Sequence, residues 1–479
     1  MTSLNNLSER GRSGASPALI GIVAGLFAAL GGLALALGGP LVGLALALVG
    51  LAAFVVLRNM EVGLWGVIGI VCLLPFATLP VDIGLTPTFL DVAMGAVVGV
   101  WLLQLVTGRQ RTIITTPLTV PLVVFIIVAI FSFIFGLSNG PLTPTLLRRF
   151  AELLLSLGFV LVVVDYSRNW VRLERLVKTL IFAGAAAALF GIILWLMPEE
   201  TANTVLNALQ RLGYPEGWVI RYIEENPELA ERAIGTSVDP NSFGGLLLLI
   251  GSLIAPQLVT RQPLLPRWVI GGAMGLVIGA LVLTFSRGAM VGLAAGLAFV
   301  AVIRYRRLIP YMLVLSALFL LLPIAQEYIA RFIAGFQGTD LATQMRFGEY
   351  TDALRLIGRY PVFGVGFAGS PDIDVYLGVA NVYLTIGQQM GLLGLLTFFV
   401  VMGTLFGYAL ANRSFFANHP RRDALWLGLH AAVAGGLVSG IFDHYLFNTE
   451  FHHAVTIFWL LVAMAVASTR LGARDAASK

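Results

Sequence analysis

Charged side chains are scarce in this sequence. Among its 479 residues only 11% are Asp, Glu, Lys or Arg, whereas soluble domains carry about 25%. Hydrophobic residues make up 58% of the chain, and the mean hydropathy is +0.90. These values exclude a disordered chain, a nucleic-acid-binding domain and an ordinary soluble enzyme, and they indicate a helical protein that crosses a membrane several times.

Cysteine is almost absent as well. Cys72 is the only cysteine, so the chain cannot form an internal disulfide and cannot hold a metal ion through several thiolates. Its position within an apolar run is typical of a small buried residue.

Long apolar segments, in contrast, are abundant. A helix that crosses a membrane needs about 20 predominantly apolar residues. Fourteen segments qualify: residues 17–37, 40–57, 62–79, 88–106, 117–136, 145–165, 175–197, 241–260, 268–285, 288–303, 308–325, 381–411, 425–442 and 454–469. Short turns separate the first four, so the predicted range is 12 to 14 spans. The predicted fold is therefore an all-α, polytopic integral membrane protein with a single transmembrane domain over residues 1–479.

The charges between these segments predict the orientation. With the N-terminus inside, the inner segments hold 20 of the 30 basic residues and 6 of the 25 acidic residues. They then carry a net charge of +14 (20 against 6), and the outer segments carry −9 (10 against 19). Because cytoplasmic loops are enriched in arginine and lysine, both termini are expected to be cytoplasmic. The net charge of +5 thus reports orientation and gives no sign of a nucleic-acid partner.

The first of two long outer loops covers residues 198–240. Apolar residues at helical spacing from 201 to 212, followed by Gly213, predict a short helix that ends at this glycine. Asn226 and Pro227 are typical of the start of a second short helix that would run to Ala233.

The second long outer loop covers residues 326–380. Residues 329–336 form a narrow apolar stripe, which suits a helix on the membrane surface. Residues 346–360 predict another helix, which ends before Pro361.

Few charges lie within the predicted spans, and those near their outer ends are the candidate functional residues. Arg148 and Glu152 are spaced as an ion pair on one helix face. Arg232 precedes residues 239–241, where a span begins. Arg287 separates two apolar runs, and a tight turn there needs glycine but no arginine. Snorkelling to lipid headgroups and phosphate binding fit Arg287 equally well.

Several short motifs together resemble the family of O-antigen ligases and O-antigen polymerases. In order, they are Arg232-Ala-Ile-Gly-Thr with Asp239-Pro240-Asn241, then Thr284-Phe285-Ser286-Arg287-Gly288-Ala289, then Arg346 leading to Pro361-Val362-Phe363-Gly364-Val365-Gly366, then Asn381-Val382-Tyr383-Leu384 with Gly391-Leu392-Leu393-Gly394. The resemblance covers about residues 60–465. Their order and spacing, and a large outer loop before the last three spans, carry the resemblance.

The resemblance implies glycan transfer from an undecaprenyl-pyrophosphate-linked donor to a sugar hydroxyl, at the outer face of the bacterial cytoplasmic membrane. By similarity, Arg232 and Arg287 are the expected pyrophosphate ligands and Arg346 a third, although Arg346 could instead brace acids of its own helix. Asn241 and Asn381 are expected in the same substrate site. The expected partners are the lipid-linked donor, an acceptor glycan, the lipid bilayer, and a chain-length regulator or flippase. No cofactor and no metal are expected.

One position departs from the family. Ligases carry a histidine just before Asn381, where it is proposed to accept the proton of the acceptor hydroxyl, and this chain has Ala380. Residues 443–453 contain three of the five histidines and are expected at the outer surface. We predict His444, beside Asp443, as the general base, with His453 as a substitute. Interfacial packing and, less favoured, a metal site are the alternatives.

Four functions are compatible with these features, and one of them is the transfer of a glycan to a protein hydroxyl. The missing histidine favours a polymerase, which extends a second lipid-linked glycan, over a ligase, which transfers the glycan to lipid A core. A membrane transporter is the alternative in a different class. It would favour broken helices at mid-depth and repeat symmetry, and neither is evident in the sequence.

Overall fold

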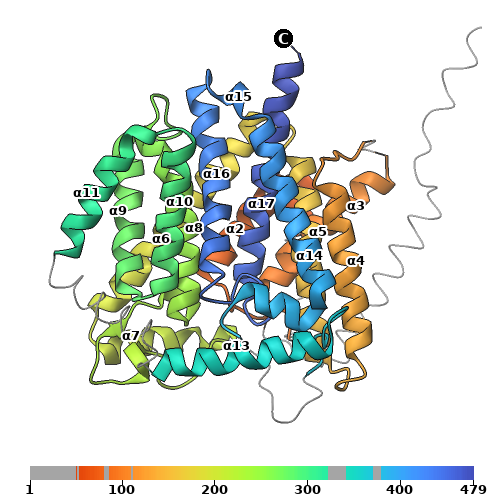
Figure 1. The fold of residues 1–479 in the computed structure, drawn as a ribbon, viewed down its shortest axis with the longest axis vertical. Coiled ribbons are helices and arrows are strands. Elements are labelled where there is room, and N and C mark those ends of the chain that lie inside the picture. The colour runs from red at the N-terminus through yellow and green to blue at the C-terminus, as the bar shows by residue number, and fades with distance from the viewer. Residues whose placement is uncertain are drawn as a thin grey trace, which may run out of the picture.

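The computed structural model describes residues 50, 53–79, 86–108, 112–321, 341–369 and 379–478. They form a helical bundle with one antiparallel pair of two-residue strands, β1 (Arg221–Tyr222) and β2 (Glu231–Arg232). Helix α13 (Leu341–Arg359) lies across one end of the bundle, here called the α13 end, and the C-terminus lies at the opposite end (Figure 1). The other α-helices are α2 (Met60–Leu73), α3 (Phe89–Val106), α4 (Thr119–Gly136), α5 (Pro144–Tyr166), α6 (Trp170–Leu196), α7 (Glu199–Asn207), α8 (Pro240–Val259), α9 (Arg267–Leu283), α10 (Arg287–Ile303), α11 (Ile309–Leu320), α14 (Val382–Ala411), α15 (Arg413–Phe416), α16 (Pro420–Ser439) and α17 (His452–Ala477).

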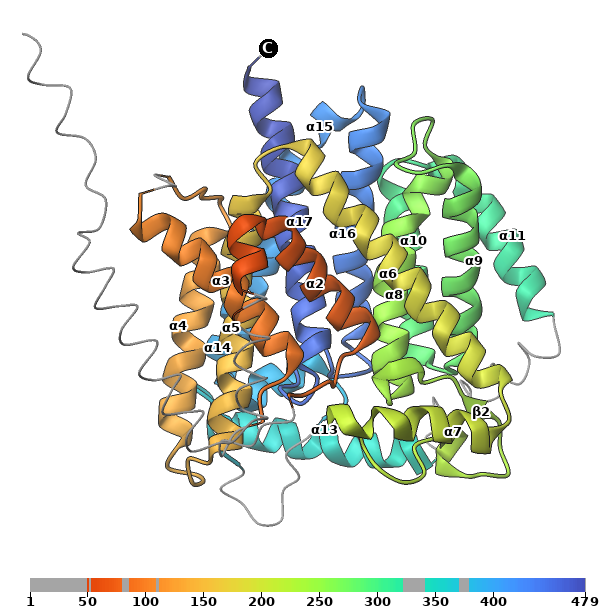
Figure 2. The ribbon, with the colours of Figure 1, turned by 180° about the vertical axis from the view of Figure 1, so that it is seen from behind.

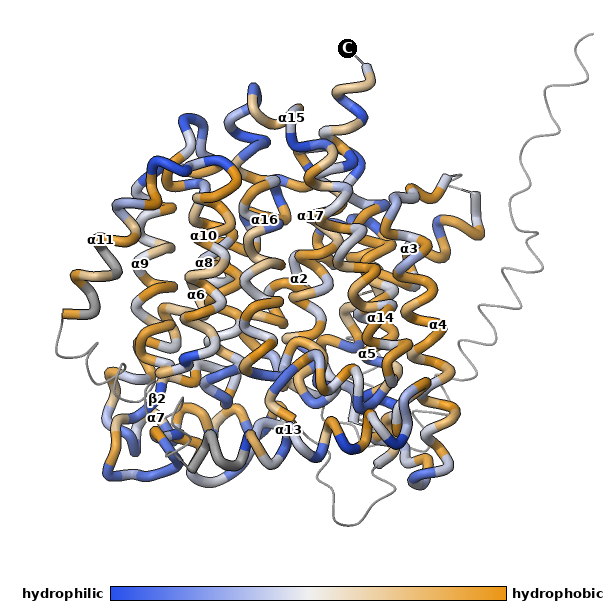
Figure 3. The backbone as a smooth tube through the Cα atoms, viewed as in Figure 1, coloured by the Kyte–Doolittle hydropathy of each residue, from blue (hydrophilic) through white to orange (hydrophobic). Residues whose placement is uncertain are grey.

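The bundle is apolar between its two ends. Hydrophobic residues follow the middle of the helices, and hydrophilic residues collect toward both ends (Figure 3). By length and composition, six of the described helices can span a membrane: α3, α4, α6, α8, α14 and α17. Helices α2, α9 and α10 are apolar but shorter. The chain is thus an all-α, multi-pass membrane protein.

The predicted spans agree with the helices wherever the structure describes them. Each predicted segment from 62–79 onward contains a described helix. The first of these is shorter than predicted, since α2 ends at Leu73 and the chain turns at Pro75. Segment 17–37 and most of segment 40–57 lie outside the described residues, so the count of 14 spans stays a prediction.

Helices α8 and α17 form the centre of the bundle. Nearly all residues of α8, and those of α17 from His452 to Thr469, are buried. Helices α2 and α6 cross the far side obliquely (Figure 2). Both helices begin at the α13 end. Because both are buried, the side chains of Ser242 and His453 in their first turns lie in the interior.

Glycine brings α10 close to its neighbours. A Cβ atom on Gly292 would lie 2.8 Å from the carbonyl oxygen of Gly435 in α16, and one on Gly288 would lie 2.9 Å from Cβ of Phe442. Small residues allow helices to pack this closely in a membrane. The contact at Gly288 places the start of α10, with Arg287, beside the segment that follows Phe442.

Helix α14 is broken at Gly391, a feature that the sequence did not make evident. Gly391 has φ +66° and ψ −171°. The freed carbonyls of Gln388 and Gln389 accept hydrogen bonds from the N–H groups of Val365 and Gly366, at 2.9 and 3.0 Å. The loop of residues 361–366 therefore fills the break, which satisfies the backbone groups that an interrupted membrane helix would leave unpaired.

The first long loop contains one predicted helix and lacks the other. Helix α7 and a 3₁₀ turn cover residues 199–212, and Gly213 follows at φ +80°, as predicted. The predicted helix from Asn226 to Ala233 is wrong. The Asn226 side chain accepts the N–H of Glu228 at 3.0 Å and forms a local turn, after which β2 pairs with β1.

Within the second long loop, the structure describes residues 341–369 and 379–380. The predicted helix over 346–360 is confirmed by α13, which ends at Arg359 just before Pro361. The predicted surface stripe at 329–336 lies outside the described residues.

Candidate functional site

Arg232 is anchored to the turn between α9 and α10. Its Nε donates to the carbonyl oxygen of Thr284 and its Nη2 donates to Oδ1 of Asn241, both at 2.8 Å. The backbone N–H of Ala233 also bonds to the carbonyl oxygen of Leu283 at 2.8 Å. A guanidinium at the carbonyl end of α9 is favourable. These bonds join β2, α8 and α9 at the α13 end and fix Arg232 with little freedom.

Two strained residues flank this anchor. Val238 has φ +58° just before α8, and Phe285 has φ +53° two residues before Arg287. Left-handed backbone is unfavourable for residues other than glycine, most of all for a β-branched residue such as valine. Such strain persists only where the surroundings impose it and is concentrated at functional sites.

Asp239 connects the arginine to the histidine segment. Its Oδ1 caps α8 by accepting the N–H of Ser242 at 2.6 Å. Burial and the negative charge of Asp443 raise the pKa of Asp239, and the Ser242 N–H and the charge of Arg232 offset only part of this effect. Asp443 therefore lies within electrostatic reach of the Arg232 anchor.

His444 is paired with Asp443. Its Nδ1 lies 3.3 Å from Oδ1 of Asp443, which also accepts the backbone N–H of His444 at 2.8 Å. Burial alone would lower the pKa of His444, but the carboxylates of Asp443, Asp239 and Glu349 outweigh it and raise the pKa above its ordinary value. The side chain of His444 remains 30% exposed.

Helices α13 and α14 meet next to this pair. Asn381 caps α14 and donates through Nδ2 to the carbonyl oxygen of Ile441 at 2.9 Å. The Tyr350 hydroxyl donates to the carbonyl oxygens of Ile441 and Ala380, each at 3.4 Å. Asn381 and α13 are thus fastened to Ile441, two residues before Asp443.

Glu349 is a candidate that the sequence did not single out. Its Oε2 accepts the backbone N–H of Ala380 at 3.1 Å, and its charge acts on His444. The carboxylate therefore lies at the position where the ligase histidine is missing. The only signal in the sequence is its place one turn after Arg346, which makes Glu349 one of the acids that this arginine could brace.

Arg287 and Arg346 lie on two other helices at the end of the bundle that holds Arg232 and the Asp443–His444 pair. Arg287 is the first residue of α10 and is partly buried. Arg346 lies one turn before Tyr350 on α13 and acts electrostatically on the Tyr350 hydroxyl. All five predicted substrate residues (Arg232, Arg287, Arg346, Asn241 and Asn381) are therefore found at the α13 end.

The three histidines of residues 443–453 are not equally placed, and the prediction that all lie at the surface is wrong. His453 is 4% exposed, and its Nε2 lies 2.9 Å from Oγ of Ser242 in α8. His452 is 7% exposed and faces Asp91. Both are the first residues of the buried helix α17, which explains their burial.

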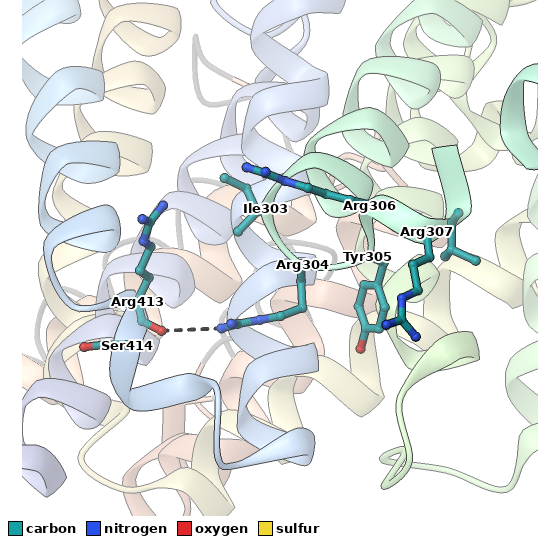
Figure 4. A pocket seen from close by; sticks show the side chains of 8 residues that line it. Ile303, Arg304, Tyr305, Arg306, Arg307, Arg413 and Ser414 are labelled. Carbon is teal, nitrogen blue, oxygen red and sulfur yellow. Dashed lines mark hydrogen bonds between the residues drawn. The ribbon is translucent and has the colours of Figure 1, made fainter. Parts of the chain in front are cut away.

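A pocket at the opposite end contains none of the predicted residues. It measures about 570 Å³ and is lined by Arg304, Arg306, Arg307 and Arg413, with Tyr305 between them (Figure 4). Arg304 is bound to Asp423, with Nη2 to Oδ1 at 2.7 Å, and to the carbonyl oxygen of Arg413. These arginines belong to the basic end of the molecule, opposite the α13 end that holds the candidate site residues.

The comparison with protein families matches part of the chain. Residues 272–399 match the family model described as O-Antigen ligase. This stretch includes Arg287, Arg346 and Asn381, and it confirms the resemblance drawn from the motifs. No curated protein matches the chain.

Proposed function

We propose that the protein moves a glycan from an undecaprenyl-pyrophosphate donor to a sugar hydroxyl. The premise is the match of residues 272–399 to the O-antigen ligase family, whose members transfer lipid-linked glycans. One observation carries the proposal. The anchored Arg232 and the start of α10, with Arg287, lie beside the Asp443–His444 pair, so that two guanidinium groups and an imidazole share one end of the bundle.

The proposed reaction uses these groups in two roles. Arg232 and Arg287 bind the pyrophosphate, because guanidinium groups match phosphate oxygens bidentately. The acceptor oxygen forms a bond to the anomeric carbon while the bond from that carbon to the pyrophosphate oxygen breaks. The arginines stabilise the negative charge that develops on the leaving pyrophosphate. Because Nδ1 of His444 faces Asp443, Nε2 is the atom that accepts the hydroxyl proton.

Within this reaction class we favour a polymerase, which extends a second lipid-linked glycan. Ala380 has no proton-accepting group, and this departure from the ligase pattern supports the choice. Transfer to lipid A core remains the second candidate. The break in α14 would favour a transporter, but the loop of residues 361–366 fills it, and the carbonyls of Gln388 and Gln389 accept hydrogen bonds from this loop.

We further propose that the α13 end faces outward and that both termini are cytoplasmic. The basic opposite end supports this orientation. Glu228, at the α13 end, and Ala417, at the opposite end, are both exposed, and each can be replaced by a cysteine to test the orientation. In a Cys72→Ala background, a membrane-impermeant maleimide added to intact cells should label position 228 only. Labelling of position 417 alone would reverse the orientation and remove the site from the outer face.

The function itself is tested with the purified full-length chain and a defined undecaprenyl-pyrophosphate oligosaccharide. We expect lipid-linked glycans of increasing length and release of undecaprenyl pyrophosphate, without any other acceptor. If products form only when lipid A core is added, the protein is a ligase. If neither acceptor is consumed, the transfer proposal fails.

A further inference from the structure

Two buried side chains and a partly buried one, from three helices, converge at the α13 end. Asp91 lies in the first turn of α3, Glu152 in the third turn of α5, and His452 at the first residue of α17. One ligand atom from each lies within 4.8 Å of the others. The three residues are far apart in sequence and belong to no motif, so the sequence did not reveal the cluster.

These side chains leave polar atoms unsatisfied. Oδ1 of Asp91, Oε1 of Glu152 and both ring nitrogens of His452 are buried and have no hydrogen-bond partner among the described residues. Glu152 and His452 are 5% and 7% exposed. Buried polar groups are nearly always paired, and each unpaired one costs about 1–3 kcal/mol. Oδ1 of Asp91 and Nδ1 of His452 face each other at 3.4 Å, Oε1 of Glu152 has only a 3.5 Å contact with Arg148, and Nε2 of His452 has no partner among the described residues, so the cluster suggests a ligand.

The geometry of the pair between Asp91 and His452 suits a shared ion. Its Nδ1···Oδ1 distance is 3.4 Å, but the atoms make no hydrogen bond. Two ligands that each lie about 2.0–2.2 Å from a tetrahedral ion are about 3.4 Å apart. The second carboxylate oxygen of Asp91 is occupied, since Oδ2 accepts the N–H of Thr88 at 2.8 Å. Oδ1 is thus held in place and directed toward the histidine.

The charge of the cluster also favours a cation. Two carboxylates face a single guanidinium, Arg148, whose Nε lies 3.5 Å from Oε1 of Glu152. That guanidinium is shared, because its Nη1 donates to the carbonyl oxygen of Thr86. The neighbouring Arg149 is directed away, to Glu450 at 2.8 Å. A divalent ion would balance the remaining negative charge.

We propose that Asp91, Glu152 and His452 bind one divalent transition-metal ion. A mixed set of two carboxylates and one imidazole suits Zn²⁺ better than Mg²⁺ or Ca²⁺, which prefer oxygen ligands alone. The ion ties the starts of α3, α5 and α17 together. His453, which follows His452, bonds to Ser242 near the Arg232 anchor. The site is thus structural, next to the proposed centre, and does not depend on the transfer reaction.

Metal binding to the purified full-length protein tests this proposal without an activity assay. After removal of metals, Zn²⁺ should bind at about one ion per chain and raise the melting temperature. Co²⁺ in its place should give the visible absorption of a low-symmetry site. Glu152→Gln and His452→Gln should each weaken binding by about 100-fold or more. Glu450→Gln, an exposed acid at the same end, is the control and should bind as the unaltered chain does.

A competing explanation is a proton held between the two carboxyl groups. It predicts no Co²⁺ absorption and no effect of Zn²⁺ or of a chelator on the melting temperature. The melting temperature would then depend on pH but not on the metal. Any of these results with the unaltered chain overturns the metal site, even if the variants fail to fold. Zn²⁺ binding that survives in His452→Gln places the ion elsewhere and also overturns it.

Discussion

Arg287→Lys should lower the rate of glycan transfer by about 30- to 900-fold, and Arg232→Lys by at least as much. Loss of one bidentate phosphate contact removes about 2–4 kcal/mol of transition-state stabilisation. A lysine keeps the charge but loses the planar fork. At position 232 it also cannot donate simultaneously to Thr284 and Asn241 in the observed arrangement. The measurement is kcat/KM for the lipid-linked donor, with membrane insertion and melting temperature followed in parallel.

Two further variants separate binding from bracing. Arg211→Lys alters an exposed arginine at the same end and should leave the rate unchanged. Asn241→Ala removes only the bond to Nη2 of Arg232, and it should lower the rate less than Arg232→Lys does. Full turnover by the double variant Arg232→Lys with Arg287→Lys would show that these arginines merely anchor helix ends.

Much of the fold can be predicted from the sequence because each membrane-spanning helix requires a long run of apolar residues. Long apolar runs predict α3, α4, α6 and α8 to within about five residues, whereas α17 continues eight residues beyond its predicted end at 469. The break in α14 could not be predicted because Gly391 is one glycine among many. A glycine interrupts this helix only where another segment, here the loop of residues 361–366, pairs with the freed backbone groups. The Asn226-Pro227 pair is compatible with a helix start and with a tight turn. The pairing of β1 with β2 selects the turn, and this pairing cannot be seen in the local sequence.

The candidate site was predictable only as far as motifs reached. The motifs located Arg232, Arg287 and Asn381, and adjacency in sequence suggested the pair of Asp443 and His444. Burial was not predictable, because His452 and His453 lie at a helix end that would be exposed in a smaller bundle. Glu349 was missed as a candidate base because its contact is with a backbone N–H thirty-one positions away, at Ala380.

His444→Ala should lower kcat by about 10²–10⁴-fold if this residue takes the proton of the acceptor hydroxyl. Donor binding should change little, since the arginines that bind pyrophosphate remain. The pH profile gives a sharper test. A base acts when neutral, so the rate should fall as the pH drops through the pKa of His444, which Asp443, Asp239 and Glu349 raise above the ordinary value. Asp443→Asn removes a nearby negative charge, so the acid limb should move to lower pH.

His419→Ala is the matched control for this test. That ring lies at the opposite end, with Nδ1 2.9 Å from the carbonyl oxygen of Phe415, and its loss should not alter the profile. An unchanged kcat in His444→Ala would remove the histidine from the reaction. The same experiment with Glu349→Gln would then be decisive, because that carboxylate lies at Ala380, where the ligase histidine is absent. If Glu349 is the base, the acid limb should persist in His444→Ala and vanish in Glu349→Gln. If neither variant slows transfer, the leaving pyrophosphate and its arginines suffice without a side-chain base.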